Sequence, residues 1–182
     1  AANSQLAYGI SPVSEMLSRN IAVGLGTDGA ASYTYDMFEL MRTAGYLQKQ
    51  KHLSADFLPA ERAIELATIN GARVLNMENE IGSLEVGKKA DIILIDMNKP
   101  HLLPVNRYAP KLVYSANGGD VRTTIIDGKV VMEDYVVQTM DEKRIMEDAV
   151  RCAKELVAGA SNDDTQKLLQ APWAGERPYW RS

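Results

Sequence analysis

The chain has 182 residues and a formal net charge of −4, and 46% of its residues are hydrophobic. That length suits one good-sized domain or two small ones, and the composition is ordinary for a globular protein. The lack of a basic patch excludes nucleic acid as an expected partner, and no apolar run approaches the roughly 18 residues of a membrane span. The single cysteine, Cys152, excludes an intrachain disulfide framework. We expect Cys152 to be a small buried hydrophobe in a reducing compartment, and the protein to be cytoplasmic.

The first part of the chain alternates helical and strand-like patterns. Residues Ile10–Arg19 have helical spacing, and Ile21–Leu25 is a short apolar run that predicts a buried strand of the parallel type. A broad apolar stripe predicts a second helix over Tyr35–Lys51. A third helix is expected from Pro59 to about Asn70, continued by a short helix over Gly71–Leu75. Helix followed by parallel strand is half of a βαβ unit.

From about residue 80 the pattern changes to strands. The continuous apolar run Ile92–Ile95 predicts a strand buried on both faces, and Lys111–Ala116 predicts a further strand. Residues Val121–Val137 contain an Asp-Gly pair between β-branched runs, which predicts a structural hairpin. An amphipathic helix is expected over Asp141–Leu156, capped by Asp141 or Thr139.

Asp28 is the strongest candidate for a functional residue. It follows the predicted strand Ile21–Leu25, and Gly26 and Gly29 flank it, so that a ligand could approach closely. The carboxyl end of a parallel strand is where α/β proteins bind ligands and metals. The alternative is that Asp28 only caps the next helix or makes an Asx-turn.

The predicted parallel strand has too few neighbours in this sequence. A parallel strand needs flanking strands to fill its hydrogen bonds and to bury both faces. The chain also begins without methionine, as a processed protein or a piece of a longer one would. We therefore expect it to be incomplete as a folding unit.

Several motifs resemble the amidohydrolase superfamily, and within it the branch of 5′-methylthioadenosine/S-adenosylhomocysteine deaminases and their chlorohydrolase-like relatives. The resemblance runs from about residue 3 to about residue 157. The segments that carry it are Asn3–Val13 (NSQLAYGISPV), Gly24–Ser32 (GLGTDGAAS), Asp36–Arg42 (DMFELMR), Ala67–Arg73 (ATINGAR), Ile81–Asp91 (IGSLEVGKKAD) and Leu112–Gly118 (LVYSANG).

The resemblance implies an α/β fold, the C-terminal part of a TIM-type (β/α)8 metal-dependent hydrolase barrel plus part of a small β-sandwich and a C-terminal helix. Residues 1–78 would be the last βα units of the barrel, residues 79–138 the sandwich segment, and residues 139–182 the C-terminal helix and tail. Ile21–Leu25 would be the last barrel strand. Asp28 would be the metal ligand, the catalytic proton shuttle and a contact of the substrate.

Family ligands other than Asp28 are missing from this sequence. The family carries a His-x-His pair, a further histidine ligand and substrate-binding residues upstream of the position of Asn3. Neither His52 nor His101 matches a ligand position, and we interpret both as surface or packing residues. A zinc site needs three or more protein ligands, so one carboxylate does not make one. Asn3 and Ser32 match family positions, where fixing a turn and capping a helix are alternatives to a functional role.

Three hypotheses on function follow from these motifs. The first is the C-terminal segment of a hydrolase that deaminates an adenosine-type nucleoside (5′-methylthioadenosine/S-adenosylhomocysteine) by metal-bound hydroxide. The second is an s-triazine (N-ethylammeline-type) chlorohydrolase or aminohydrolase. The third is a non-catalytic fragment that needs a partner chain.

The cofactor and partners are expectations drawn from the same resemblance. The expected metal is divalent: zinc, with iron or manganese as alternatives. The expected partners are a small nucleoside or heteroaromatic amine, an upstream barrel half from another chain or a missing segment, and further copies in a homo-oligomer.

Overall fold

The computed structural model describes residues 2–28 and 34–159. Its contacts divide the chain into two compact units, residues 1–138 and residues 139–182. The elements of the described part, in chain order, are α1 (Ala2–Gln5), α2 (Val13–Ser18), α3 (Met37–His52), α4 (Ala60–Ala67), α5 (Ile69–Val74), β1 (Ile92–Ile95), α6 (Tyr108–Tyr114), the 3-10 helix η1 (Gly118–Asp120), β2 (Val121–Ile126), β3 (Lys129–Glu133), β4 (Val136–Val137) and α7 (Glu142–Gly159).

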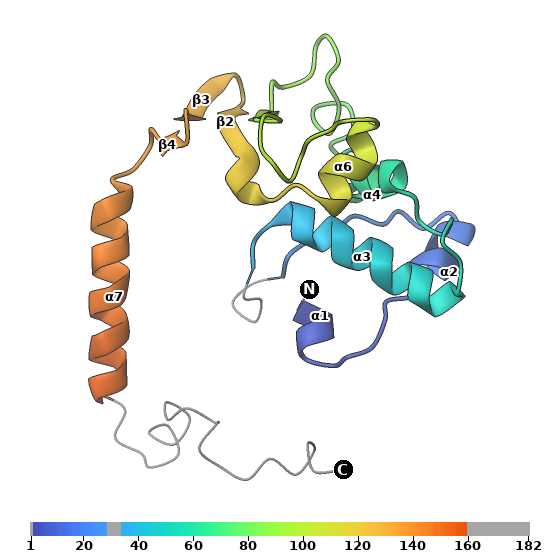
Figure 1. Ribbon diagram of the computed structural model, residues 1–182, viewed down its shortest axis with the longest axis horizontal. Coiled ribbons are helices and arrows are strands. Elements are labelled where there is room, and N and C mark those ends of the chain that lie inside the picture. Colours follow the sequence, from blue (N-terminus) through green and yellow to red (C-terminus); the bar gives the residue numbers. More distant parts are fainter. Residues whose placement is uncertain (1, 29–33, 160–182) are drawn as a thin grey trace. The chain divides into compact units, whose positions relative to one another are not determined.

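Helix α3 is the longest element of the first unit, and it lies beside α4 and α6 (Figure 1). It begins at Met37 because the side chain of Asp36 accepts a hydrogen bond from the Phe38 amide at 2.8 Å. It ends at His52, and the next residue, Leu53, adopts the left-handed conformation with φ 49°. The helix predicted over residues 35–51 is confirmed within two residues at each end.

Two short helices replace the long one predicted from Pro59. Thr68 leaves the helical conformation, with φ −126° and ψ −100°, and separates α4 from α5. Its hydroxyl donates to the Ile64 carbonyl at 2.7 Å. Helix α2 also occupies only Val13–Ser18 of the range predicted to be helical.

The predicted parallel strand Ile21–Leu25 is not formed in the described part of the chain. The segment has no strand partner there, although the Leu25 amide donates to the Leu66 carbonyl at 3.0 Å. A strand is stabilised by a ladder of bonds to its neighbours, so the apolar pattern alone does not produce one.

Strands β1 to β4 form one antiparallel sheet in the order β1-β2-β3-β4. The predicted hairpin is confirmed: β2 and β3 are joined by Asp127 and Gly128, both with positive φ (50° and 76°). Two positive φ values are what a type I′ turn requires, and Asp-Gly adopts them readily.

Two strand predictions are wrong. Strand β1 is present, but Ile93 and Leu94 are about half exposed (48% and 52%), so the strand is not buried on both faces. It pairs only with β2 among the described strands. The segment Lys111–Ala116, predicted as a strand, instead supplies the second half of α6, which ends at Tyr114. Ala109 and Val113 of this helix face the core at helical spacing.

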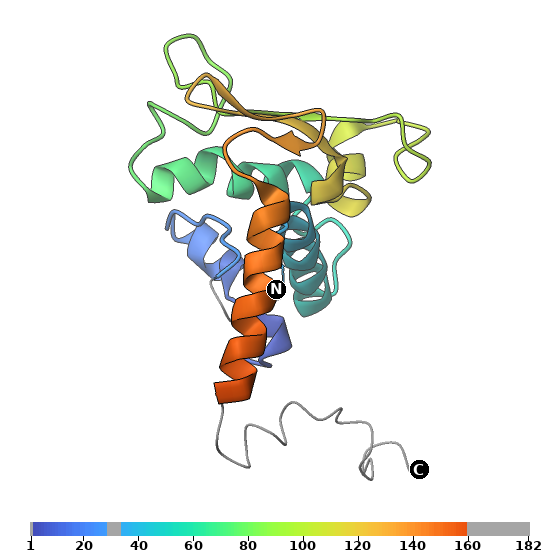
Figure 2. The same ribbon diagram turned by 90° about the vertical axis from the view of Figure 1, so that its left-hand side faces the viewer.

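The core of the first unit lies where α3, α4 and α6 meet. It is made of buried residues from these helices and the loops around them, with β1 and β2 packed against it through Ile95 and Val121. Figure 2 shows the strands as a layer over the helices. The buried residues are Phe38, Met41, Ala60, Ala63, Leu102, Val113 and Ala116.

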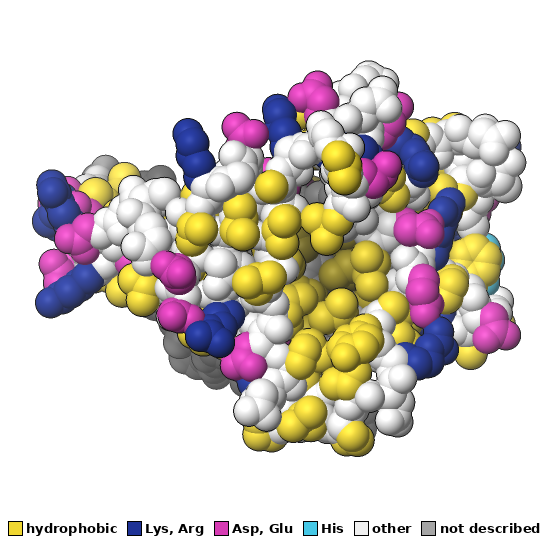
Figure 3. Space-filling view, turned by 90° about the horizontal axis from the view of Figure 1, so that it is seen from above, with side chains coloured by type: hydrophobic (Ala, Val, Ile, Leu, Met, Phe, Trp, Pro, Cys, Tyr) yellow, Lys and Arg dark blue, Asp and Glu magenta, His cyan; other side chains and the backbone are white. Residues whose placement is uncertain are grey.

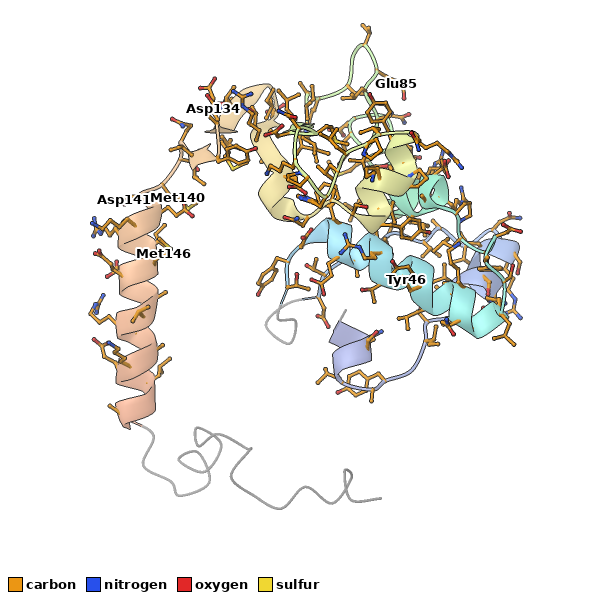
Figure 4. All side chains as sticks on the ribbon, viewed as in Figure 1. Tyr46, Glu85, Asp134, Met140, Asp141 and Met146 are labelled. Atoms are coloured by element: carbon orange, nitrogen blue, oxygen red, sulfur yellow. The ribbon has the colours of Figure 1, made fainter. Side chains whose placement is uncertain are left out.

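The second unit is described only as helix α7. Asp141 lies at its start and accepts a hydrogen bond from the Arg144 amide at 3.0 Å, while Met146 projects from its side (Figure 4). Cys152 is exposed on this helix, so the prediction of a buried cysteine is wrong. Ile145 and Val150 are also about half exposed. Within residues 2–28 and 34–159, no helix has the length and apolarity that a membrane span requires.

Candidate functional site

Asp28 lies at the end of the extended segment that begins at Ile21. Its backbone is left-handed, with φ 64°, and the residue is exposed. Its carbonyl accepts a hydrogen bond from the Thr27 hydroxyl at 3.3 Å. Left-handed φ is tolerated by aspartate better than by most residues, so the backbone at Asp28 is compatible with its side chain.

A pocket of about 250 Å³ adjoins Asp28. Its walls come from three parts of the chain: α1 with the segment that follows it, the extended segment Val23–Asp28, and the inner face of α3. Asn3, which the sequence also marked, lines the same pocket as Asp28. The fold therefore brings both residues to one cavity. Ser32, the other marked residue, lies outside the described residues.

Gln48 contributes a buried polar group to this pocket. The residue is 2% exposed, and its Nε2 donates to the Ser11 carbonyl at 2.8 Å. Its Oε1 has no hydrogen-bond partner within the described ranges. A buried acceptor is stabilised by a donor, and water or a ligand in the pocket can supply one to this oxygen.

The described residues do not form a metal centre by themselves. Nowhere in the described part of the chain do three side chains of histidine, cysteine, aspartate or glutamate gather as a metal ion would need. Asp28 is therefore at most one ligand of a site, and any others must come from elsewhere.

His52 fills a packing role. Its ring stacks on Phe57 with a centroid distance of 3.9 Å, and its Nε2 lies 2.9 Å from the Ser14 hydroxyl. The Ser14 hydroxyl in turn donates to the Glu15 carboxylate. Because the Ser14 hydroxyl donates its hydrogen bond to Glu15 and not to His52, Ser14 and His52 do not form an activated nucleophile.

His101 has a partner that sequence reasoning missed. Its Nε2 lies 2.9 Å from the carboxylate of Asp120, whose side chain is only 2% exposed. Burial raises the pKa of Asp120, but hydrogen bonds from His101, the Asn117 amide and Lys99 outweigh it and leave the pKa below its ordinary value. This cluster stabilises the turn that holds η1.

An apolar groove of about 710 Å³ also adjoins the extended segment. Gly24 and Leu25 line it together with α5, the loop around Gly82, and β1. Leu75 and Leu84 in its walls are 63% and 75% exposed. Figure 3 shows hydrophobic side chains gathered around a hollow on one face of the molecule. Exposed apolar surface of this kind is typical of interaction or ligand sites.

The start of α3 is held by the segment Val113–Gly118. The second carboxylate oxygen of Asp36 accepts a hydrogen bond from the Gly118 amide at 2.9 Å. The guanidinium of Arg42 donates to the carbonyls of Val113 (3.1 Å) and Ala116 (2.5 Å). The sequence analysis did not identify these contacts of Asp36 and Arg42. Asp36 could have been recognised as a helix N-cap, because it precedes an apolar helical stripe and is followed three residues later by Glu39.

Most of the chain matches a known family model. A family model described as the amidohydrolase family matches residues 1–131. The chain belongs to the amidohydrolase family. This confirms the superfamily that the sequence motifs suggested.

Other amidohydrolases resemble the chain closely over part of their length. A 5′-deoxyadenosine deaminase of Methanosarcina acetivorans is 51% identical over 160 residues, which are 87% of this chain and 37% of that protein. A 5-methylthioadenosine/S-adenosylhomocysteine deaminase of Desulforudis audaxviator is 49% identical over 156 residues, 85% of this chain and 36% of the relative. The chain thus spans little more than a third of the length of the curated relatives it matches.

A solved structure shares the fold of this chain over part of its own length. The zinc-bound adenosine deaminase of Xanthomonas campestris superposes with a TM-score of 0.81 and 32% identity, over 85% of this chain and 35% of that one. The described part of the chain is therefore a mixed α/β portion of a metal-dependent hydrolase barrel protein.

Proposed function

We propose that this chain is the C-terminal part of an enzyme that hydrolytically deaminates an adenosine-type nucleoside. The observation that carries the proposal is the identity of 46–51% with deaminases of 5′-deoxyadenosine and of 5-methylthioadenosine/S-adenosylhomocysteine. These relatives act on nucleosides that differ at the 5′ position and share the adenine amine. The comparison therefore supports the adenine amine as the reacting group more strongly than it supports any one 5′ substituent.

A division of the chain is part of the same proposal. We propose that residues 1–78 complete the barrel, residues 79–138 contribute to a β-sandwich, and residues 139–182 form a C-terminal helix and tail. An upstream segment, from the same polypeptide or another chain, would supply the strands beside Ile21–Leu25. The extended backbone there and the apolar groove beside Leu25 support this proposal.

Asp28 would be the residue of this chain that takes part in the reaction. The zinc in the Xanthomonas campestris enzyme supports a divalent metal, and Asp28 would contribute one carboxylate oxygen to it. A divalent metal, when bound, makes a water molecule more acidic. The carboxylate of Asp28 would hold a proton taken from the attacking water and pass it to the leaving amine. Its exposure beside the pocket leaves it accessible to water and to substrate.

The other hypotheses have weaker support. The s-triazine hydrolase alternative predicts close relatives with that activity, whereas the relatives at 46–51% identity are nucleoside deaminases.

A homo-oligomer is also proposed, and the half-exposed Ile145, Met146 and Val150 on α7 support it. Light scattering of the complete protein should give a mass that is a multiple of the protomer, and a monomer would contradict this.

The experiment compares the complete protein with its Asp28→Asn variant. We expect the wild type to release ammonia from 5′-deoxyadenosine and the variant to lose at least about a thousandfold in kcat, because asparagine cannot carry the proton. Asp56→Asn is the matched control, since Asp56 is exposed and does not line the pocket. Circular dichroism should show both variants folded.

Two results would contradict the proposal. A complete, metal-loaded wild type that leaves all adenosine-type nucleosides unchanged would refute deamination. Wild-type turnover in Asp28→Asn would refute the proton-transfer role while leaving the reaction class intact.

A further inference from the structure

The segment Leu112–Gly118 matches a family motif, yet it contributes no group to the reaction proposed above. It packs against both α3 and α4, and it makes side-chain hydrogen bonds with the first part of α3. Val113 and Ala116 are fully buried against Phe38 and Met41. Three side-chain hydrogen bonds from Asp36 and Arg42 join the same two segments. The motif is therefore a platform for the start of this helix.

Asp36 makes two contacts that an asparagine could not make together. One carboxylate oxygen accepts from the Phe38 amide at 2.8 Å, which begins α3. The other accepts from the Gly118 amide at 2.9 Å, which fixes the helix to the platform. An asparagine offers one acceptor and one donor, so either orientation of its amide would leave one of these two backbone N–H groups facing another N–H.

The start of α3 is coupled to the candidate site. Leu40 and Thr43 of this helix line the same pocket as Asp28. The Leu40 amide bonds the Asp36 carbonyl at 3.1 Å, so that Leu40 follows the position of the first turn. Only seven residues separate Asp28 from Asp36 along the chain. A shift of the first turn would move one wall of the pocket relative to Asp28.

We propose that Asp36 is a positioning residue, which sets the geometry of the Asp28 pocket by holding α3 on the Val113–Gly118 platform. It does not touch the reacting atoms. Arg42 shares this role, because its guanidinium holds two carbonyls of the same platform. The proposal rests on the proposed function only in taking the Asp28 pocket as the active site.

The test uses the complete protein with Asp36→Asn, and Asp141→Asn as the matched control. Both substitutions are made at helix N-caps, where asparagine and aspartate are nearly equivalent. Asp141 caps α7 through the Arg144 amide. The two variants thus differ in the bond to Gly118. Arg42→Lys is the second variant, because a single ammonium cannot reproduce the forked contact with Val113 and Ala116.

We expect Asp36→Asn to speed hydrogen exchange in peptides that cover residues 113–120. Its kcat should fall about 10- to 100-fold with KM changed less than about twofold, which is the usual cost of losing a supporting contact at a metal site. Arg42→Lys should change kcat in the same direction. Asp141→Asn should leave exchange at 113–120 and both kinetic constants unchanged. Wild-type kcat in Asp36→Asn, or an equal loss in Asp141→Asn, would overturn the proposal.

A zinc titration separates this proposal from the deaminase assignment. If the wild type releases no ammonia, the proposed function fails, and zinc affinity becomes the measure of positioning. Asp36→Asn should then bind zinc about tenfold more weakly than Asp141→Asn. Equal zinc affinities in the two variants would overturn the positioning role.

Discussion

Gly82 should be far less tolerant of alanine than Gly87, although both have nearly the same backbone conformation. Gly82 has φ 90° and Gly87 has φ 96°. A Cβ atom at position 82 would lie 2.8 Å from the Ala72 Cβ and 2.9 Å from the Ile69 Cα. A Cβ atom at position 87 would meet nothing within 4 Å. Comparing the alanine variants at these two positions therefore separates the cost of backbone strain from the cost of packing against α5.

The magnitudes follow from these contacts. Positive φ costs a residue with a Cβ roughly 1–2 kcal/mol, and this applies to both variants. At Gly82, α5 must also move away, because carbon atoms pack no closer than about 3.5 Å, and such overpacking costs about 1–3 kcal/mol. We expect Gly82→Ala to lower the free energy of unfolding by about 2–5 kcal/mol and Gly87→Ala by about 1–2 kcal/mol.

Urea unfolding of the complete protein, followed by circular dichroism, measures both values. A difference of at least about 1 kcal/mol between the variants is expected. If the two variants unfold with equal free energies, the close approach of the Gly82 loop to α5 is wrong. The wall of the groove beside Leu25 would then need another arrangement.

Two further predictions concern the loss of stability at low pH and the packing of the core. Because the pKa of Asp120 is lower in the folded protein, its contribution to stability is present above the ordinary carboxyl pKa of about 3.9 and is lost as the pH falls through the lowered value. Urea midpoints measured from about pH 6 to about pH 3 should therefore fall less steeply in Asp120→Asn, and an unchanged acid slope would contradict this. Leu66 is fully buried and Leu53 is 90% exposed. Leu66→Ala should cost about 2–5 kcal/mol in the same assay and Leu53→Ala less than about 0.5 kcal/mol, so similar losses would refute the placement of α4 in the core.

Features fixed by neighbouring residues could be predicted from the sequence. The Asp127-Gly128 turn needs only two residues that accept positive φ, and both have it. Helices α3 and α7 begin and end close to the predicted positions, since their apolar stripes and N-caps are local. Asp28 could be marked because it follows a recognisable apolar run and turn.

Features that depend on distant partners could not be predicted. The run Ile21–Leu25 has the composition of a strand, but a ladder needs neighbours that the described chain does not place beside it. Lys111–Ala116 contains Val113, which favours strands, yet burial against α3 selects the helix. His101 and Asp120 lie 19 positions apart in the sequence, and Asp36 and Gly118 lie 82 positions apart. No local sequence pattern reveals either pairing.

The hydrogen bond between Asp36 and Gly118 also sets an order of events during synthesis. Ribosomes add about 5–20 residues per second, so the 82 residues between donor and acceptor take roughly 4–16 s to appear. Throughout that interval the start of α3 lacks its platform, and Phe38 and Met41 lack their cover from Val113 and Ala116. With the role proposed for Asp36, the Asp28 pocket cannot acquire its final shape before Gly118 has been made, and a chain interrupted before Gly118 leaves it unfinished.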